Sequence, residues 1–176
     1  MANRYSFEFF PPKTEAGREK LVATRNELNS LAPDFFSVTY GAGGSTRDNT
    51  RGIVLDAKAA GIDVAPHLSF GGDEEEEVLA LVEQYRQAGV RRIVALRGDI
   101  PSGMGATRLV YARELVEFIR KHTGDHFELE VAAYPEVHPD APSYEQDVAY
   151  LKEKLDAGAN SAITQYFFNA DAYFYF

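Results

Sequence analysis

Six short apolar runs of this sequence each contain, or end beside, polar side chains that could take part in chemistry. The runs are Tyr5–Phe10, Phe35–Thr39, Val64–Leu68, Arg92–Leu96, Leu129–Ala133 and Ala162–Gln165. The polar side chains are Glu8, Thr39, Tyr40, His67, Arg97, Asp99, Tyr134, Glu136, His138 and Gln165. Carboxylates and imidazoles can transfer protons, and amides can orient a substrate. The pattern predicts a site where the ends of these runs meet.

Several chemistries are disfavoured by the sequence. No cysteine is present, which excludes disulfides, thiolate metal sites and a cysteine nucleophile. The lysines, at positions 13, 20, 58, 121, 152 and 154, avoid the run ends, which disfavours Schiff-base chemistry. Neither a Gly-x-Ser-x-Gly elbow nor a Gly-Lys-[Ser/Thr] phosphate loop occurs. His122 and His126 are expected near a helix end on the opposite side, so no metal site is expected, and the rim suits a planar organic cofactor.

The apolar runs are expected to be strands that alternate with helices. They recur at roughly 28 to 36 residues, about the length of a βαβ unit, and some are almost continuously apolar, as strands of a covered parallel sheet are. Glycines at positions 61, 89 and 158 each follow an alanine shortly before a strand, which predicts a helix end at each. Helix starts are predicted at Asp73, at Ser143 with Gln146, and at Asn169.

Repeated β/α units predict an α/β fold, either a doubly wound sheet or a barrel. No Gly-x-Gly-x-x-Gly string follows the first strand, which weakens the doubly wound alternative. A closed TIM-type (β/α)8 barrel typically needs about 250 residues. The 176 residues therefore predict a single, incomplete barrel domain over 1–176, with about six of the eight units and a site at the C-terminal ends of the strands.

Composition narrows the partners and the location. The formal net charge of -9 and pI of about 4.9 argue against a nucleic-acid surface. No apolar run approaches the roughly 20 residues that cross a bilayer, so no membrane partner is expected. The absence of cysteine suits a reducing compartment, and a cytoplasmic location is expected.

Each candidate residue also has a structural interpretation. Glu8 alternates with Phe7 and Phe9, so it should point into the barrel mouth, either as a carboxylate paired with an arginine or as a general acid. Asp99 could pair with Arg97, and His67 could be a core or ligand-contacting imidazole. The loop 41–44 could be a flexible turn or a close approach to a ligand. The aromatic residues after Gln165, at 166–168 and 173–176, are expected in the core.

Taken together, the strings at the strand ends resemble the flavin-dependent methylenetetrahydrofolate reductases. The matching strings are Phe7–Pro12, Ser37–Gly44, Ala65–Leu68, Ala95–Asp99, Ala133–Pro139 and Asp156–Gln165. They occur in the family's order over nearly the whole chain. The family fold is an eight-stranded β/α barrel, in agreement with the spacing.

The resemblance implies a flavoprotein oxidoreductase of one-carbon metabolism and methionine biosynthesis. In this family a nicotinamide cofactor, NADH or NADPH, reduces bound FAD, and the flavin passes hydride to 5,10-methylenetetrahydrofolate to give 5-methyltetrahydrofolate. The folate ring first opens to an iminium, which requires a proton on a ring nitrogen. The implied partners are these small molecules and, in the full-length protein, further copies of the chain in a homo-oligomer.

The resemblance also implies roles for individual residues. Glu8 matches the acid, Asp99 a carboxylate near flavin and folate, and Gln165 a substrate-binding amide. The implied flavin contacts are Thr39, Tyr40, Ala42, His67, Arg97, Gly98, Asp99, Tyr111, Ala112, Tyr134, His138, Ala141, Asp147 and Lys154.

Two departures from the family and two other functions stay open. Some members have adjacent basic residues where this chain has Glu153-Lys154, and the family's last strands have no counterpart in the 176 residues. The chain could instead be a non-catalytic flavin- or folate-binding remnant, or a barrel lyase or isomerase without flavin.

Overall fold

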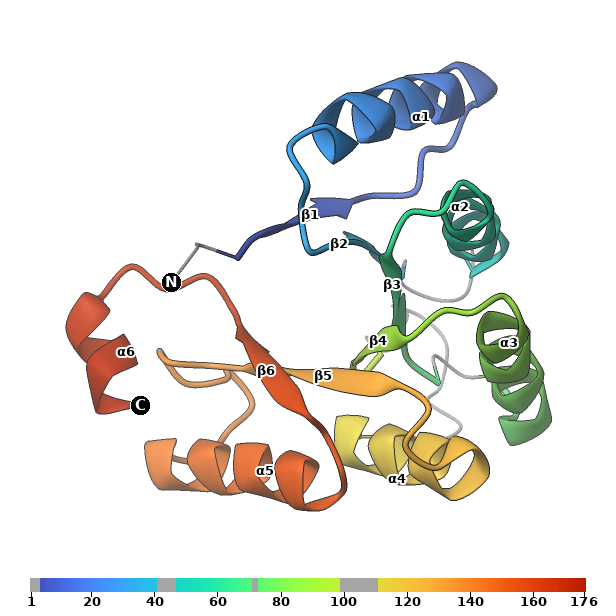
Figure 1. Ribbon diagram of the computed structural model, residues 1–176. Coiled ribbons are helices and arrows are strands. Elements are labelled where there is room, and N and C mark those ends of the chain that lie inside the picture. Colours follow the sequence, from blue (N-terminus) through green and yellow to red (C-terminus); the bar gives the residue numbers. More distant parts are fainter. Residues whose placement is uncertain (1–3, 41–46, 71–72, 99–110) are drawn as a thin grey trace.

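The computed structural model describes residues 4–40, 47–70, 73–98 and 111–176. Strands and helices alternate along this part of the chain (Figure 1). The strands are β1 (Ser6–Phe9), β2 (Phe35–Val38), β3 (Val64–Leu68), β4 (Arg92–Ala95), β5 (Glu128–Ala133) and β6 (Ser161–Thr164). The helices are α1 (Glu15–Asn29), α2 (Arg47–Ala59), α3 (Glu75–Gln87), α4 (Ala112–Thr123), α5 (Tyr144–Asp156) and α6 (Ala170–Tyr175).

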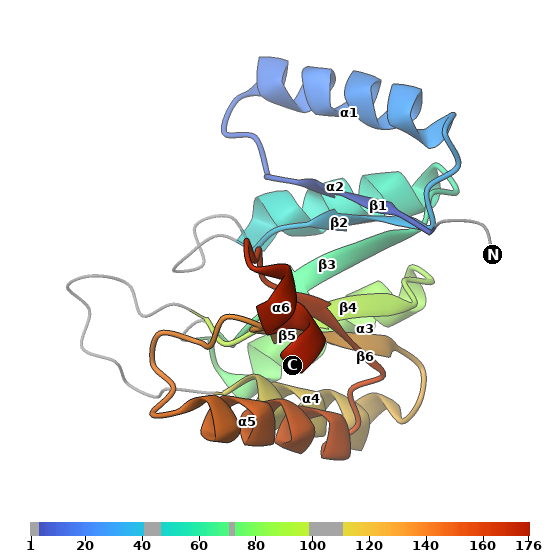
Figure 2. The same cartoon turned by 90° about the vertical axis from the view of Figure 1, so that its left-hand side faces the viewer.

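The strands form one parallel sheet in the order β1-β2-β3-β4-β5-β6. Each strand pairs with the next one along the chain, because a β/α unit returns the chain beside the strand it has just left. The sheet curves, and α1 to α5 lie along its outer side (Figures 1 and 2). This arrangement is an α/β half-barrel, and the six predicted strands are confirmed.

The pairing register separates the two faces of the sheet. Phe7 pairs with Phe36, and Glu8 pairs with Ser37. Phe36 is buried and stacks with Phe7 and Phe9, with ring centroids 5.9 and 5.5 Å away. Side chains alternate between faces along a strand, so Glu8 and Ser37 lie on the face opposite the phenylalanines. The apolar core therefore fills the space between the sheet and its helices, and the polar residues are left on the concave face.

The predicted helix ends at glycine are confirmed. The backbone at positions 61, 89 and 158 has a positive φ, of 76°, 78° and 114°. At Gly158 a side chain is disfavoured for a second reason, because a Cβ would lie 3.0 Å from the Arg120 side chain, which would have to shift. That guanidinium donates hydrogen bonds to the carbonyl oxygens of Gly158 and Phe127 and to the side chain of Asn160. The close approach ties the end of α4 to the turn before β6.

Two of the three predicted helix starts are confirmed. The Ser143 hydroxyl accepts a hydrogen bond from the Gln146 amide at 3.2 Å, and the Asn169 side chain caps α6. Asp73 is not the cap of α3, so that prediction was wrong: the helix begins at Glu75 after Glu74. The Asp73 carboxylate is held instead by side chains from the preceding β/α unit.

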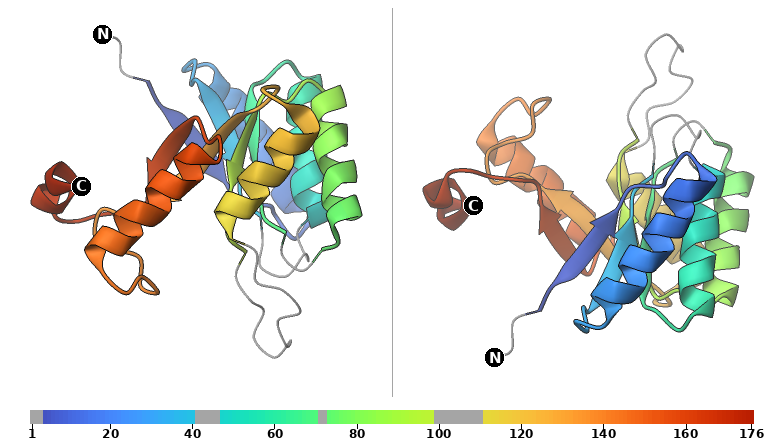
Figure 3. Two further views of the ribbon diagram at one scale, coloured as in Figure 1. Left: turned by 90° about the horizontal axis from the view of Figure 1, so that it is seen from below. Right: turned by 90° about the horizontal axis from the view of Figure 1, so that it is seen from above.

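The aromatic residues after β6 are not in the core, contrary to expectation. Tyr166 is 89% exposed and Phe168 is 96% exposed. β6 is an outer strand of the sheet, and α6 follows it at the end of the described chain (Figure 3). The expectation failed because it rested on residue type alone, whereas burial needs a covering element. Within the described ranges, no helix has both the length and the apolar character needed to cross a membrane.

One charged side chain lies on the buried side of a helix. Arg25 is 5% exposed and lies along α1 between Leu21 and Leu28 on the side that faces the core. Its Nη2 donates to Asn26 at 3.2 Å, whereas Nε and Nη1 have no hydrogen-bond partner among the described residues. A buried guanidinium with unpaired nitrogens destabilises the folded state.

Replacing Arg25 by methionine is therefore expected to raise the free energy of unfolding by about 1 to 3 kcal/mol. The measurement is chemical denaturation followed by circular dichroism. Lys20→Met, at an exposed position of the same helix, is the control and should change stability by less than about 0.5 kcal/mol. A loss of stability in Arg25→Met would show that the guanidinium is well paired in solution.

Candidate active site

The concave face of the half-barrel carries ionisable side chains from four strands. Glu8 of β1 and His67 of β3 come together across β2, with Glu8 Oε2 3.3 Å from His67 Nε2. Arg92 of β4 forms ion pairs with Glu130 and Glu128 of β5. The first pair lies where catalytic groups of parallel β/α folds are found, toward the C-terminal ends of the strands.

Burial controls the protonation of the Glu8–His67 pair. It raises the pKa of the Glu8 carboxyl, and a hydrogen bond with Ser37 opposes this rise. It lowers the pKa of the His67 imidazole to about 4. The pair therefore contains a neutral imidazole at neutral pH, beside a carboxyl group that binds its proton more tightly than usual.

The surroundings of Glu8 differ in one respect from those expected. A general acid is expected to need apolar walls around its carboxyl group, and Phe7, Phe9 and Phe10 are the apolar neighbours of Glu8 in the sequence. Phe7 and Phe9 stack on the opposite face of the sheet, and Phe10 is 75% exposed. The Glu8 side chain is itself 49% exposed, so its desolvation comes from the sheet and the neighbouring His67.

A hydrogen-bonded network holds the residues that follow β2. The Tyr40 hydroxyl donates to Asp73 at 3.1 Å, and Asp73 lies 3.0 Å from the guanidinium of Arg47. Burial and the nearby Asp73 carboxylate both raise the pKa of Tyr40. The Thr39 amide donates to the Phe9 carbonyl, which fixes the end of β2 against β1. Thr39 and Tyr40 are thus positioned by partners from three β/α units.

Arg97 and its neighbours follow β4. The Arg97 guanidinium donates to Asp140 at 2.7 Å, and Gly98 is half-buried beside it. This bond links the end of β4 to the loop after β5. Two predicted site residues, Asp99 and Ala42, lie outside the described residues. The alternative pairing of Arg97 with Asp99 is therefore not tested.

The turn after β5 brings Tyr134 and His138 together. Their ring centroids are 4.6 Å apart in an edge-to-face arrangement. Between them Val137 has a φ of 67°, a region that β-branched residues rarely enter. The His138 amide donates to the buried Asp147 carboxylate at 3.1 Å, and Ala141 donates to the His138 carbonyl. The turn is therefore fixed from both sides.

Lys154 of α5 reaches under the same turn. Its Nζ donates to the Ala132 carbonyl at 2.6 Å and lies 5.9 Å from the centre of the Tyr134 ring. Burial lowers the pKa of Lys154, and the charge of Asp147 opposes the change. The structure thus brings together Tyr134 and His138 of the turn after β5 with Asp147 and Lys154 of α5.

Three further predicted residues lie at exposed or partly exposed positions. Gln165 is exposed after β6, and its side-chain oxygen accepts a hydrogen bond from the Tyr166 amide. Tyr111 and Ala112 begin α4, where the Tyr111 amide donates to Glu114. No contact of these three with the Glu8–His67 pair is recorded in the described part of the chain.

Sequence reasoning missed several residues that hold the site in place. Asp73 and Asp140 each bond to a predicted site residue, and Ser37 lies opposite Glu8 in the strand register. Glu136, which the sequence had indicated as a polar residue after a strand, accepts hydrogen bonds from the backbone amides of Phe168 and Asn169, at 3.0 and 2.8 Å. Only Ser37 had a usable signal, because it is a polar residue inside an apolar run. The other contacts join loops whose spacing in the sequence carries no information about proximity.

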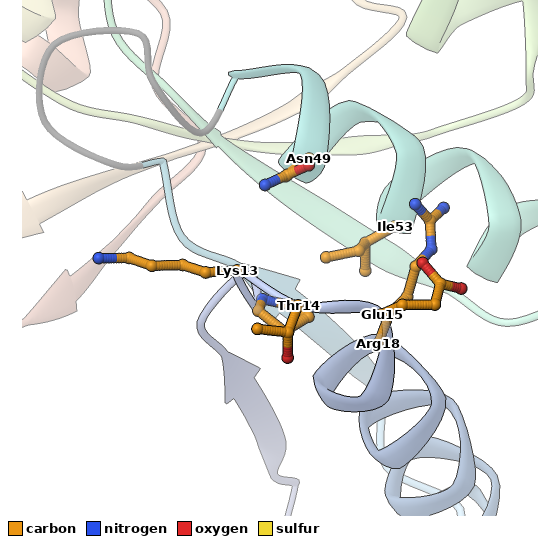
Figure 4. Close-up of a pocket in the computed structure, with 7 residues that line it drawn as sticks. Lys13, Thr14, Glu15, Arg18, Asn49 and Ile53 are labelled. Atoms are coloured by element: carbon orange, nitrogen blue, oxygen red, sulfur yellow. The ribbon is translucent and has the colours of Figure 1, made fainter.

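A small cavity lies away from these residues. Its volume is about 120 Å³, and Figure 4 shows its lining, which comes from the segment after β1, from α1 and from α2. The lining residues are Pro12, Lys13, Thr14, Glu15, Arg18, Asn49 and Ile53. None of the predicted site residues lines it. In the part of the chain that the structure describes, no group of three or more histidine, aspartate or glutamate side chains could hold a metal ion.

A curved parallel sheet with helices outside it and titratable side chains at its strand ends is typical of enzymes with a β/α-barrel type of fold. Comparison of the sequence with known protein families then identifies the family to which the chain belongs. The chain belongs to the methylenetetrahydrofolate reductase family, whose model matches residues 2–176.

Curated relatives support this membership. The chain is 46% identical over 172 residues to the 5,10-methylenetetrahydrofolate reductases of Pectobacterium carotovorum subsp. carotovorum and Escherichia coli strain K12. Each match covers 97% of this chain and 57% of the relative's length. The chain is also 40% identical to methylenetetrahydrofolate reductase (NADH) 1 of Arabidopsis thaliana, covering 98% of this chain and 32% of that protein.

Solved structures support the fold. A crystal structure of 2,3-dimethylmalate lyase, a member of the PEP mutase/isocitrate lyase superfamily, matches with a TM-score of 0.62. An oxaloacetate acetylhydrolase matches with a TM-score of 0.61. The matches cover 96% and 97% of this chain and 59% and 61% of those chains, at 14% and 13% identity. At this identity the likeness concerns the fold alone.

The lowered pKa of His67 predicts a pH dependence of stability. An unfolded histidine has a pKa of about 6.5, so unfolding takes up a proton between that value and the folded value of about 4. The stability that neutral His67 contributes is complete above pH 6.5 and is lost as the pH falls toward 4. In the wild type, His67 should lower the free energy of unfolding by on the order of 2 kcal/mol between pH 7.5 and pH 4.5. His67→Gln should abolish this part of the pH dependence.

The measurement is denaturant unfolding at both pH values, with His122→Gln, at an exposed position on α4, as the control. An unchanged pH dependence in His67→Gln would contradict burial of the neutral imidazole.

Proposed function

We propose that this chain forms most of the catalytic barrel of an enzyme that reduces 5,10-methylenetetrahydrofolate to 5-methyltetrahydrofolate, with FAD as cofactor and NADH or NADPH as reductant. In this proposal residues 1–176 supply about six of the eight units of one (β/α)8 domain. The observation that carries it is the position of Glu8 on the concave face beside His67, in a chain that matches the reductase family over residues 2–176.

The concave face offers groups suited to a flavin. The buried His67 Nε2 has no hydrogen-bond partner among the described residues, although it lies close to Glu8. Lys154 of α5 is a half-buried cation beneath the turn after β5, and its charge is destabilised by desolvation, so an anionic pyrophosphate nearby would offset that cost. The proposed flavin contacts are Thr39, Tyr40, Ala42, His67, Arg97, Gly98, Asp99, Tyr111, Ala112, Tyr134, His138, Ala141, Asp147 and Lys154. When bound, a flavin supplies the hydride acceptor and donor that a side chain cannot provide.

The side chains of the protein supply the proton and the electrostatics. Glu8 is the proposed acid for the folate ring nitrogen, a role that requires a carboxyl group with a raised pKa. Asp99 is proposed to place a negative charge near the cationic folate iminium. Gln165 is proposed to bind the substrate through its amide. Neutral His67 adds no positive charge beside Glu8, which helps the acid to keep its proton.

The first test is spectroscopic. The intact protein loaded with FAD is expected to be yellow, to lose its flavin absorbance with NADH or NADPH, and to recover it when 5,10-methylenetetrahydrofolate is added. Absence of bleaching with both nicotinamides would contradict the reductase. Retention of flavin with no hydride transfer would indicate the binding-only alternative, and failure to take up FAD would favour a barrel enzyme without flavin.

Glu8→Gln is expected to separate the two half-reactions. Bleaching by the nicotinamide should survive, whereas reoxidation by the folate should slow by about 10² to 10⁴-fold, because a positioned acid contributes about that much. Rapid-mixing absorbance measurements follow each step. Glu19→Gln, at an exposed position of α1, is the matched control and should leave both rates unchanged. Equal losses in both half-reactions would mean that Glu8 is structural.

A further inference from the structure

Ser37 occupies the position directly opposite Glu8 in the sheet. The two residues are register partners in β1 and β2, and both lie on the concave face. Neighbouring strands are about 4.8 Å apart, so side chains of register partners on one face are in contact range. Ser37 is 5% exposed, whereas the Glu8 side chain is 49% exposed. The serine is thus a buried polar residue on the same face of the sheet as the Glu8 carboxyl group and directly beside it in register.

We propose that Ser37 is a positioning residue for Glu8, holding its carboxyl group beside His67 through a hydrogen bond between the two strands. This inference rests on the proposed function, in which Glu8 is the acid. Neither composition nor the family strings assign a role to Ser37.

The hydrogen bond and the burial of Glu8 act in opposite directions. Burial favours the neutral carboxyl group and raises its pKa, whereas the Ser37 hydroxyl donates to the carboxylate and lowers the pKa. An acid needs both influences, because it must hold a proton at neutral pH and must still release it to the substrate. When Glu8 gives its proton to the folate ring nitrogen, the carboxylate that remains accepts the Ser37 hydrogen bond. The carboxylate is then protonated again from solvent.

No fixed charge near Glu8 is recorded that could take over this role in the described part of the chain. His67 of β3 is the titratable group recorded near the Glu8 carboxyl, at 3.3 Å, and burial keeps it neutral. The next charged side chains on the concave face, Arg92 and Glu130, are paired with each other. Ser37 is therefore the group that offsets the effect of burial on the Glu8 proton.

The test combines a titration with kinetics. Ser37→Ala should move the pKa of Glu8 upward, as measured by ¹³C NMR of the labelled carboxyl carbon, because the bond that favours the carboxylate is lost. In the intact, flavin-loaded enzyme the rate of folate reduction at pH 7 should fall about tenfold, the value of one hydrogen bond to a charged group. The pH at which that rate declines should move upward, and bleaching by the nicotinamide should keep its wild-type rate.

Two variants serve as controls. Ser37→Thr keeps the hydroxyl and should restore the wild-type titration. Ser161→Ala removes a serine from β6, two strands beyond the Arg92 strand, and should leave the Glu8 titration unchanged. An unchanged Glu8 pKa in Ser37→Ala, or an equal loss of both half-reactions, would overturn the proposal. A shifted Glu8 pKa in a protein that does not reduce the folate would support the role of Ser37 and overturn the reductase function.

Discussion

The parallel pairing of β1 to β6 determines which side chains can meet. In a strand the side chains alternate, so the register places whole sets of residues on one face or the other. Glu8 meets Ser37 and His67 because β1, β2 and β3 are paired in phase. A shift of one residue between β1 and β2 would bring Phe7 or Phe9 to the concave face and bury Glu8 among the helices. The stacked Phe7, Phe9 and Phe36 rings therefore also secure the register that places Glu8 on the concave face.

The rim of the half-barrel is held by polar contacts rather than by apolar packing. Arg97 is bonded to Asp140, Tyr40 to Asp73, and the His138 amide to Asp147. Each contact joins loops from different β/α units, so the ends of the strands are fixed relative to one another. Such preorganisation lowers the entropic cost of ordering the site when a ligand binds. Two other contacts stabilise the half-buried ammonium group of Lys154, namely the hydrogen bond to the Ala132 carbonyl and the charge of Asp147.

The sequence was sufficient for the repetitive part of the structure and insufficient for the loops. All six strands lie within one residue of their predicted limits or inside them, because each strand is a short, mostly apolar run between segments of helical pattern. The helix ends at Gly61, Gly89 and Gly158 followed from the positive φ that such an end requires. Alternation alone placed Glu8 on the face away from its phenylalanine neighbours.

The predictions that failed depended on contacts between distant segments. Asp73 resembled a helix cap, yet Tyr40 and Arg47 hold its carboxylate. Tyr166 and Phe168 resembled core residues, yet both are exposed. In each case the residue type was known, and only its neighbours in space were missing.

The unusual backbone of Val137 has a consequence for how this region can change. A β-branched residue at positive φ costs on the order of 1 to 3 kcal/mol, and glycine at the same position would remove that cost. Glycine would also loosen the turn that sets Tyr134 edge-on to His138. Val137 therefore lowers the stability of the folded chain at a turn that holds Tyr134 and His138, two of the proposed flavin contacts. Selection for thermal stability alone would favour glycine at position 137. The same substitution would loosen the arrangement of the Tyr134 and His138 rings.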